Sequence, residues 1–277
     1  MTIFSSDDSE SISKILAYTS TGTVTEYPDL YDLTFPERAD ELQFYLERSN
    51  LVEEILELGV GTGRIALPLA RQGRKVVGVE NSSAMVSYMQ ERVARESQEV
   101  RARISVVQQD ARTYAPGKTF KSVFAPFMMF NYLLTTDDQL LFMRNISAIL
   151  ARQGTAVLEL MTPATLPELY LNDGIRRTVL QKNDDGADQR ILEVQRTVRY
   201  DASIQVVEQD RYYRFFQDGL LVQEKCVTWR NRLCSLGEVD LLLRCSGLKL
   251  LNTYGDHRSA KFCHESKFLI VEISHAA

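Results

Sequence analysis

Residues 55–70 read ILELGVGTGRIALPLA, and this stretch decides the fold. Gly59, Gly61 and Gly63 follow a short apolar run directly and precede a run with helical spacing. Glycine is needed where a turn demands positive φ, and where the backbone must touch a ligand without a Cβ in the way. The stretch therefore predicts a strand, a ligand-binding turn and a helix.

The spacing of these glycines distinguishes two kinds of nucleotide site. Nicotinamide cofactors are bound by G-x-G-x-x-G, whose last glycine lets helix and strand pack closely. Here the third glycine comes one residue early, and Arg64 stands where the last glycine would be. Because an arginine side chain there would obstruct that packing, the spacing predicts a ligand without a pyrophosphate.

Strands and helices alternate on both sides of the turn. Strand-like runs cover 54–58, 75–80, 103–109, 122–127 and 155–161, and helical runs cover 64–72, 83–97 and 137–151. This alternation predicts an α/β fold with a doubly wound, mostly parallel sheet and right-handed crossovers. A helix at 235–247 and two antiparallel strands at 248–254 and 266–274 bring the expected sheet to seven strands.

The pattern changes after Met161. Residues 175–230 hold long polar-alternating runs with turn sequences but no helices between them, which predicts an inserted antiparallel β-meander after the fifth strand. Three parts are therefore expected. Residues 1–50 form an N-terminal lid and a first helix, and residues 51–162 with 231–277 form the doubly wound domain. Residues 163–230 form an auxiliary antiparallel sheet.

Two acidic residues at strand ends add to the site. Glu80 ends the second strand, where a carboxylate can accept hydrogen bonds from both ribose hydroxyls. Asp110 follows the third strand, where its carboxylate can take an adenine amino group. The carboxyl ends of parallel strands meet at one edge of a sheet, so a nucleoside site is expected there.

With the E-x-G-x-G-x-G turn and these two acids, the sequence resembles the class I S-adenosylmethionine (SAM) dependent methyltransferases. The stretches EYPDLYD (26–32), GVENSSAM (78–85) and ESKFLIVEI (265–273), with the meander, resemble the sugar amino N-methyltransferases of macrolide antibiotic pathways and their small-molecule relatives. The resemblance covers roughly residues 26–275. Two features depart from it: Glu80 stands where aspartate is frequent, and the leader before EYPDLYD is long.

The resemblance implies SAM as cofactor. It implies that the cofactor is bound by Glu57, Gly59, Val60, Gly61, Gly63, Arg64, Glu80, Asn81, Met85, Asp110, Ala111 and Phe127. In that arrangement Gly59 to Gly61 approach the methionine portion, Glu80 holds the ribose, and Asp110 with Ala111 holds the adenine.

The loop after the fourth strand, APFMMFNYLLT (125–135), is expected beside the cationic sulfur, and it contains no carboxylate, histidine or lysine. Phe127, Phe130 and Tyr132 are candidates to face that sulfur or to pack in the core. Asn131 must be satisfied if buried, so it holds either backbone or substrate. With Tyr31 and Tyr27 of the leader, the expected catalytic residues are Asn131, Phe127, Tyr31 and Tyr27.

These features predict methyl transfer from SAM to a small acceptor, most readily an amine of secondary metabolism, because an amine can be recruited neutral and needs no strong base. An alternative keeps the fold and makes SAM the only substrate: its amino group attacks its own γ-carbon, as in the azetidine-2-carboxylate synthases, and methylthioadenosine leaves. A third alternative is a SAM-binding subunit without catalysis.

The composition of the chain limits which kinds of binding partner are expected. The chain has 277 residues and a net charge of −5, and its basic residues form no stripe that could follow a phosphate backbone, so nucleic acid is not expected. No apolar run is long enough to span a membrane, and no secretory signal is present, so a cytoplasmic enzyme with a small-molecule substrate is expected. The meander either covers the pocket or builds a homodimer.

Cysteines and histidines suggest no metal site. The four cysteines match neither zinc nor redox spacing and are expected to be reduced and structural. The three histidines, His257, His264 and His275, are expected at the surface, with no metal bound.

Overall fold

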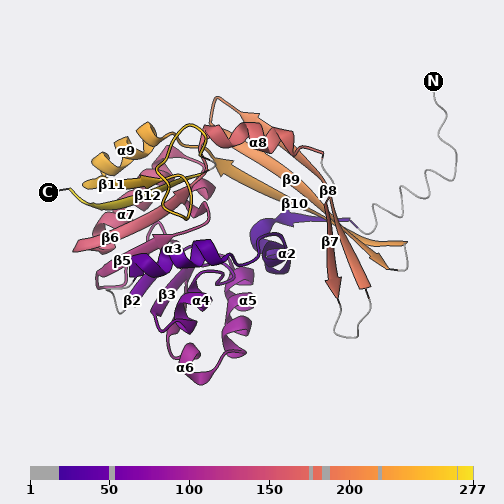
Figure 1. The fold of residues 1–277 in the computed structure, drawn as a ribbon, viewed down its shortest axis with the longest axis horizontal. Helices are drawn as coiled ribbons and strands as arrows, with labels where there is room; N and C mark the ends of the chain where they lie inside the picture. The colour runs from indigo at the N-terminus through magenta and orange to yellow at the C-terminus, as the bar shows by residue number, and fades with distance from the viewer. Residues whose placement is uncertain are drawn as a thin grey trace. The chain divides into compact units, whose positions relative to one another are not determined.

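The computed structural model describes residues 19–49, 54–174, 177–182, 188–217, 220–266 and 268–276. The chain divides into two compact units (Figure 1). The larger unit comprises Thr25–Pro167, Asp201–Val206 and Asn231–Ala277, and the smaller comprises Met1–Val24, Glu168–Tyr200 and Val207–Arg230. Residues 1–18 of the expected N-terminal lid lie outside the described residues.

A seven-stranded sheet forms the centre of the larger unit and confirms the predicted fold class. Its strands in spatial order are β11 (Leu248–Tyr254), β12 (Leu269–His275), β6 (Leu150–Leu160), β5 (Phe120–Ala125), β2 (Glu54–Leu58), β3 (Lys75–Glu80) and β4 (Ile104–Gln108). Strand β12 lies between β11 and β6 and runs antiparallel to both. The carboxyl ends of β2, β3, β4, β5 and β6 therefore meet at one edge of the sheet.

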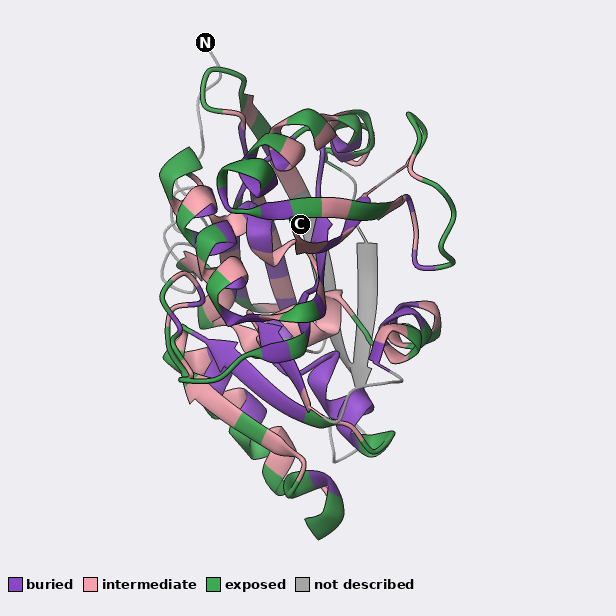
Figure 2. Ribbon diagram, turned by 90° about the vertical axis from the view of Figure 1, so that its left-hand side faces the viewer, coloured by how far each residue is buried: buried purple, intermediate pink, exposed green. Residues whose placement is uncertain are grey.

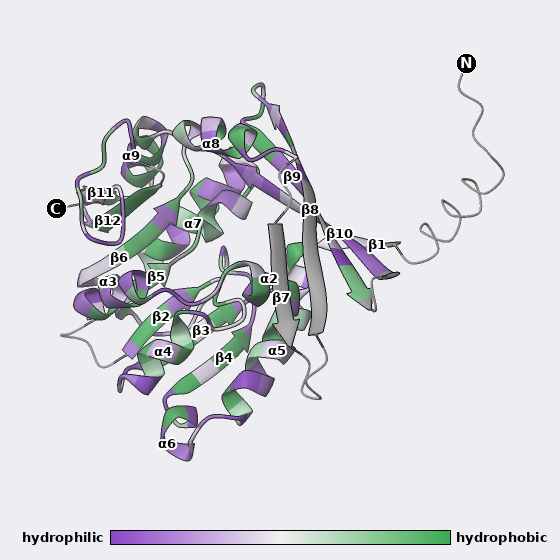
Figure 3. Ribbon diagram, turned by 45° about the vertical axis from the view of Figure 1, so that its right-hand side comes forward, coloured by the Kyte–Doolittle hydropathy of each residue, from purple (hydrophilic) through white to green (hydrophobic). Residues whose placement is uncertain are grey.

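Helices cover both faces of this sheet. On one face, α3 (Ala39–Ser49), α4 (Ala66–Arg71) and α5 (Ser83–Ala94) contribute apolar residues to one buried cluster. On the other face, α7 (Thr136–Ile149) and α9 (Leu236–Cys245) contribute to a second. Figure 2 shows the buried residues gathered in the strands, and Figure 3 shows hydrophobic residues along β2 and β4.

Shorter helices connect these elements. They are η1 (Val24–Glu26), α2 (Pro28–Thr34), α6 (Gln98–Arg101), η2 (Met129–Tyr132), η3 (Pro163–Thr165) and α8 (Leu166–Leu171). None of the helices in the described ranges is long and apolar enough to cross a membrane.

Two boundaries differ from the sequence prediction. The helix that the sequence predicts over residues 36–49 is α3, and it begins at Ala39 rather than at Pro36. Strand β6 begins at Leu150, directly after α7, rather than at residue 155. Gly154 lies inside this strand, where an added Cβ would come within 3.0 Å of the Lys121 carbonyl oxygen. The glycine therefore permits the close approach of the chain to β5 rather than interrupting the strand.

The smaller unit is built on a five-stranded sheet. Its strands in spatial order are β1 (Thr19–Thr23), β10 (Leu220–Arg232), β9 (Val206–Gln217), β8 (Asp188–Asp201) and β7 (Arg177–Lys182). Strands β7 and β8 pair antiparallel, as the turn sequences predict, whereas β1 pairs parallel with β10. Alternation is clear in β9, where Val207 and Tyr213 are buried and Glu208 and Asp210 pair with Arg199.

The division of the chain differs from the expected one at its start. Strand β1 belongs to the unit with the five-stranded sheet, while α2 and α3 belong to the unit with the seven-stranded sheet. The reason is pairing: β1 adds to the edge of β10, whereas Phe44 and Tyr45 of α3 are buried in the core of the larger unit.

Candidate cofactor site

The glycine turn joins β2 to α4 in a conformation that favours glycine. Gly59, Gly61 and Gly63 have φ values of +73°, +54° and +82°. A Cβ at Gly59 would lie 2.3 Å from Cγ of Met129, whereas a Cβ at Gly61 would meet nothing closer than the Gly59 carbonyl oxygen at 4.0 Å. Gly61 therefore borders open space, as expected of a backbone that a ligand approaches closely.

Glu80 lies beside this turn at the carboxyl end of β3. Its Oε2 accepts the Gly61 N–H at 3.2 Å, and its Oε1 accepts the N–H groups of Asn81 and Ser82, both at 2.9 Å. Burial nevertheless raises the pKa of Glu80, and these three N–H groups oppose that shift. The carboxylate is thus fixed next to the turn, where the sequence places a ribose acceptor.

Asp110 follows β4 and is engaged by a neighbouring cation. Its carboxylate accepts the Arg112 N–H at 2.8 Å and pairs with the Arg112 guanidinium at 2.5 Å, and Arg112 also pairs with Asp138. The hydrogen bond from the Arg112 side chain holds the pKa of Asp110 below its ordinary value. An adenine amino group would therefore have to share this carboxylate with Arg112.

The remaining expected cofactor residues surround these groups. Val60 and Met85 are buried, and Asn81 is exposed at the carboxyl end of β3. Ala111 is buried, and its carbonyl oxygen accepts a hydrogen bond from Asn145 Nδ2 at 2.8 Å. Val60 packs against Gly78 of β3 so closely that a Cβ at Gly78 would lie 2.8 Å from both Cγ atoms of Val60.

The loop after β5 is strained at its first two residues after Pro126. Phe127 and Met128 have φ values of +49° and +60°, a region that costs a non-glycine residue about 1 to 3 kcal/mol. The ring of Phe127 contacts Tyr31 and Phe35 of the leader, with centroid distances of 5.7 and 4.7 Å. Four partly exposed aromatic residues of the site, Tyr31, Phe35, Phe127 and Tyr132, are called the aromatic wall below.

Arg64 is buried behind this wall. Its two terminal nitrogens hold both oxygens of Glu41 in α3, at 2.5 and 2.7 Å, and its Cζ lies 4.2 Å from the centroid of the Phe127 ring. The guanidinium therefore ties the glycine turn to α3 and to the Phe127 loop. These contacts give Arg64 a scaffolding role, and its direct contact with the cofactor stays a prediction.

Tyr31 and Tyr27 lie in and before α2. The Tyr31 N–H donates to the Tyr27 carbonyl oxygen at 3.0 Å, which starts the helix. Burial is the largest influence on the Tyr31 hydroxyl and raises its pKa above the ordinary tyrosine value. Tyr31 is therefore a neutral hydroxyl at physiological pH and cannot serve as a base.

Asn131 holds backbone, and its predicted catalytic role is wrong in this respect. Its side chain is fully buried; Nδ2 donates to the carbonyl oxygens of Met161 at 3.1 Å and Arg232 at 2.6 Å, and Oδ1 accepts the Met161 N–H at 2.8 Å. Phe130 is also a core residue, fully buried against Phe142 with a centroid distance of 5.8 Å. Neither side chain is directed at a ligand.

Glu57 is a buried acid within β2. Its Oε2 has no hydrogen-bond partner, and burial raises its pKa to about 8, with Arg64 opposing the shift. A buried carboxyl with an unused oxygen, next to a turn that borders open space, fits a ligand carrying a positive charge.

The sequence reasoning did not foresee a buried cluster of charged side chains. Glu41, Glu159 and His257 are buried, and their potential metal-ligand atoms lie within 4.8 Å of one another. Both oxygens of Glu41 are taken by Arg64, and His257 Nε2 lies 3.3 Å from Glu159 Oε2, so the cluster is two ion pairs. The surface position expected for His257 is wrong. An acid inside the apolar run TAVLELM was the available signal, because a buried acid needs a partner.

A second missed cluster joins α2 to the glycine turn. Asp32 accepts the Thr62 hydroxyl at 2.5 Å through Oδ1 and pairs with Arg92 of α5 at 3.0 Å through Oδ2. Arg92 also donates to the Thr62 carbonyl oxygen at 3.1 Å. This set, Asp32, Thr62 and Arg92, is called the Asp32 latch.

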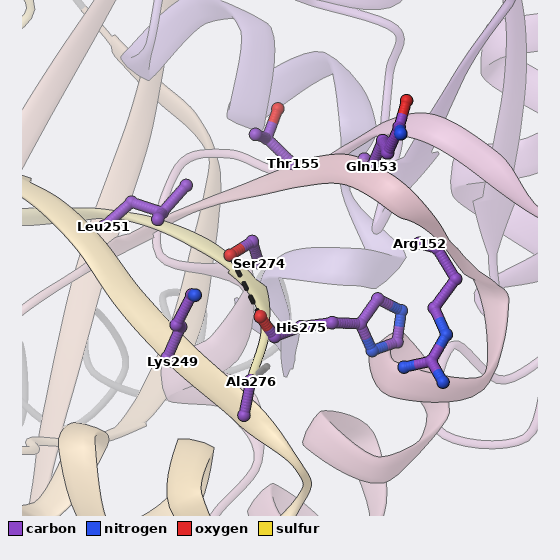
Figure 4. Close-up of a pocket in the computed structure, with 9 residues that line it drawn as sticks. Arg152, Gln153, Thr155, Lys249, Leu251, Ser274, His275 and Ala276 are labelled. Atoms are coloured by element: carbon purple, nitrogen blue, oxygen red, sulfur yellow. Dashed lines mark hydrogen bonds between the residues drawn. The ribbon is translucent and has the colours of Figure 1, made fainter.

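A surface hollow of about 550 Å³ lies elsewhere on the same unit (Figure 4). It is lined by residues at the amino end of β6, the start of β11 and the end of β12, including Arg152, Lys249 and His275. Because this is the opposite edge of the sheet from Glu80 and Asp110, the hollow is separate from the candidate cofactor site.

Comparisons with known proteins agree with this geometry. Residues 55–154 match the family model described as a methyltransferase domain. The structure of the CcbJ methyltransferase from Streptomyces caelestis is 26% identical, with 92% of this chain and 99% of that chain covered and a TM-score of 0.74. The sugar N-methyltransferase KedS8 from Streptoalloteichus sp ATCC 53650 shares the fold at 16% identity, with 92% and 95% covered and a TM-score of 0.70.

Two further comparisons concern the cofactor and a shorter match. The glycopeptide N-methyltransferase MtfA complexed with SAM is 17% identical over 100% of both chains, with a TM-score of 0.61. The protein YqeM of Bacillus subtilis (strain 168) is 29% identical over 118 residues, 42% of this chain and 45% of its own length.

The fold and the site define a nucleoside-binding enzyme domain of the doubly wound class. With these comparisons, residues 55–154 form a methyltransferase domain, and the chain has the fold of the class I SAM-dependent methyltransferases, as its glycine turn and strand-end acids predict. SAM is accordingly its cofactor, and the open space at Gly61 and the unpaired oxygen of Glu57 fit that molecule.

Proposed function

We propose that this enzyme transfers the methyl group of SAM to an amine of a small molecule. The observation that carries the proposal is the chemistry of the loop after β5, whose residues 125–135 bring aromatic and apolar side chains to the site but no carboxylate, histidine or lysine. A phenol or enol acceptor needs a base to become nucleophilic. A neutral amine does not, and it can lose its proton to water after the transfer.

The activities named for two structurally similar proteins support an amine acceptor. KedS8 is a sugar N-methyltransferase and MtfA is a glycopeptide N-methyltransferase, and both share the fold of this chain. The proposed setting is therefore the methylation of an amino group on a small molecule of secondary metabolism.

Each residue of the candidate site has a proposed role that follows from its position. Gly59 and Gly61 admit the methionine portion of SAM, Glu80 accepts its ribose hydroxyls, and Asp110 with Ala111 holds its adenine. Bound SAM supplies a methyl group on a positively charged sulfur. The aromatic wall excludes water there, and Phe127 turns a ring face toward that charge, because cations are attracted to aromatic faces. The protein then contributes mainly alignment of the amine with the methyl group.

A trial with SAM alone tests the reaction class. Purified protein is incubated with SAM, and the products are identified by mass spectrometry. Methyl transfer predicts little turnover until an amine acceptor is added, after which S-adenosylhomocysteine (SAH) accumulates together with a product heavier by one methyl group. An amine screen should include amino sugars and small amino acids.

The cyclisation of SAM is the other outcome of that trial. It would give methylthioadenosine and a four-membered cyclic amino acid at a catalysed rate, above the slow breakdown of SAM in buffer. The Asn131 amide does not support this reaction, because it is bound to the backbone of Met161 and Arg232 and is not free to position the SAM amine. Enzyme-dependent methylthioadenosine would nevertheless overturn the proposal of methyl transfer while leaving the cofactor site unchanged.

A further inference from the structure

Three segments of the chain meet on a single buried oxygen atom. Oε2 of Glu159, in β6, accepts the N–H of Phe127 at 3.0 Å. The same oxygen lies 3.3 Å from Nε2 of His257, which follows β11. Glu159 is 1% exposed and the His257 side chain 2% exposed, so water does not screen this contact.

The pKa shifts of both side chains favour an ion pair. Burial raises the pKa of Glu159, but His257 and the Phe127 N–H outweigh burial and lower the pKa below its ordinary value. Burial lowers the pKa of His257, but the nearby Glu159 carboxylate outweighs burial, so the pKa is raised above its ordinary value. Glu41 and Arg64 are the other charged groups of this cluster. A carboxylate facing an imidazolium is a strong acceptor, so the Phe127 N–H makes a charge-assisted hydrogen bond.

The backbone of Phe127 needs such a restraint. It occupies the left-handed region without being glycine, and such a conformation persists only where the surroundings hold it. Its ring is restrained separately, by the Arg64 guanidinium and the edges of Tyr31 and Phe35. Backbone and ring are therefore fixed by different groups, and the Glu159 and His257 pair is the one that holds the backbone.

We propose that Glu159 and His257 are positioning residues for the cationic end of SAM, acting through Phe127. They fix the Phe127 peptide in its left-handed conformation, which keeps its ring in the aromatic wall, and neither side chain touches the ligand. The inference rests on the proposed function, in which Phe127 faces the charged sulfur.

The test compares the affinities of SAM and SAH, because SAH has the same adenosine and amino acid portions but no charge on sulfur. Calorimetry gives both dissociation constants for the full-length protein and its variants. Phe127→Leu should lower the preference for SAM over SAH by about threefold to thirtyfold, the range for losing a cation at an aromatic face. Glu159→Leu removes the acceptor and should lower the preference similarly, whereas Glu159→Gln, which keeps an acceptor oxygen, should restore most of it.

The double variant Phe127→Leu with Glu159→Leu gives the decisive result. If Glu159 acts through Phe127, the double variant shows the same SAM preference as Phe127→Leu alone. Independent, additive losses would overturn the inference, and so would a wild-type preference in Glu159→Leu. A merely structural role would lower the affinities of SAM and SAH together and leave their ratio unchanged.

Other outcomes distinguish a failure of this inference from a failure of the proposed methyl transfer. A wild-type preference in Phe127→Leu would remove the sulfur-facing role of Phe127 and the inference with it, whereas methyl transfer itself is judged by the product assay. If Glu159→Leu does not fold, His257→Phe keeps the ring contacts and removes the N–H, and should lower the preference, with rescue by His257→Gln. A preference that is lost with EDTA and restored by Zn²⁺ would instead assign Glu41, Glu159 and His257 to a metal.

Discussion

At the scale of single residues, Gly59 and Gly61 differ in what surrounds them although both have positive φ. A Cβ at Gly61 meets open space, whereas a Cβ at Gly59 meets Met129 at 2.3 Å. We expect Gly61→Ala to cost about 1 kcal/mol of stability, from backbone strain alone, while SAH affinity falls steeply. Gly59→Ala should lose stability as well as affinity. Thermal melts and calorimetry with SAH distinguish the two, and an unaltered SAH affinity in Gly61→Ala would remove the turn from the binding site.

Glu57 predicts a pH dependence of stability. Its pKa is about 8 in the folded protein, above the ordinary 4.5, so the unfolded chain gives up this proton first as the pH rises. Stability contributed by Glu57 is therefore complete below pH 4.5 and falls as the pH rises from there to about 8. Glu57→Gln should remove this loss, on the order of a few kcal/mol for a shift of this size.

The measurement is urea unfolding of both proteins at several pH values between 5 and 8.5. The variant should gain on the wild type as the pH rises, and at pH 8 it should bind SAM more weakly, because it lacks a carboxylate for the positive charge. A constant difference in stability across that range would show that Glu57 does not change its protonation on folding.

Residue-level prediction from sequence succeeds where a role follows from position in a parallel sheet. Glu80 ends β3 and Asp110 follows β4, both at the carboxyl edge of the sheet, as their places in the sequence indicate. The role of Asn131 could not be read in this way, since its partners lie 30 and 101 residues away and come from packing. The pair of Glu159 with His257 is likewise a tertiary contact. Its only signal in the sequence is an acidic residue inside an apolar strand.

At the scale of elements, the Asp32 latch joins α2 to the glycine turn and to α5. Because α2 is expected to cover the bound cofactor, weakening the latch should let the cofactor escape faster. We expect Asp32→Asn to raise the dissociation rate of SAH by about threefold to tenfold, consistent with a weakened charge-assisted hydrogen bond. Asp29→Asn, at an exposed position of the same helix, is the matched control. Stopped-flow displacement of SAH measures both, and equal rates in the two variants would contradict the role of the latch.

Element order was only partly predictable. The alternation of strands and helices predicted the doubly wound sheet, and the helix predicted at 235–247 is α9, which begins with a capping box of Ser235 and Glu238. Nothing local could place β1 beside β10 in parallel, because Thr19 to Thr23 is short and polar and its partner strand lies about two hundred residues later. Pairings of such separation depend on the completed sheet, not on the strand itself.

At the scale of the whole molecule, the two units share the chain in an interleaved way. Strands β8 and β9 belong mainly to the smaller unit, yet the turn between them, Asp201–Val206, belongs to the larger one. There Gln205 accepts the Leu233 N–H at 2.8 Å and an Arg232 guanidinium N–H at 2.6 Å. The turn is thus held by the larger unit, and we expect both units to unfold in one cooperative transition.

The single tryptophan of the chain makes this measurable. Trp229 lies buried in β10 of the smaller unit, so its fluorescence reports that unit, whereas the candidate cofactor site lies in the larger one. One transition predicts that circular dichroism and Trp229 emission share a midpoint and that SAH raises both by mass action. Separate midpoints, with only one moved by SAH, would show that the units unfold independently.

The contact between Gly78 and Val60 has a consequence for how such chains diverge. Gly78 has no unusual φ, so glycine is needed there only because Val60 lies against it. The two positions therefore share a fixed volume. In related sequences, a larger residue at position 78 should therefore occur together with a smaller residue at position 60. A substitution that enlarges only one of the two positions would displace the cofactor turn.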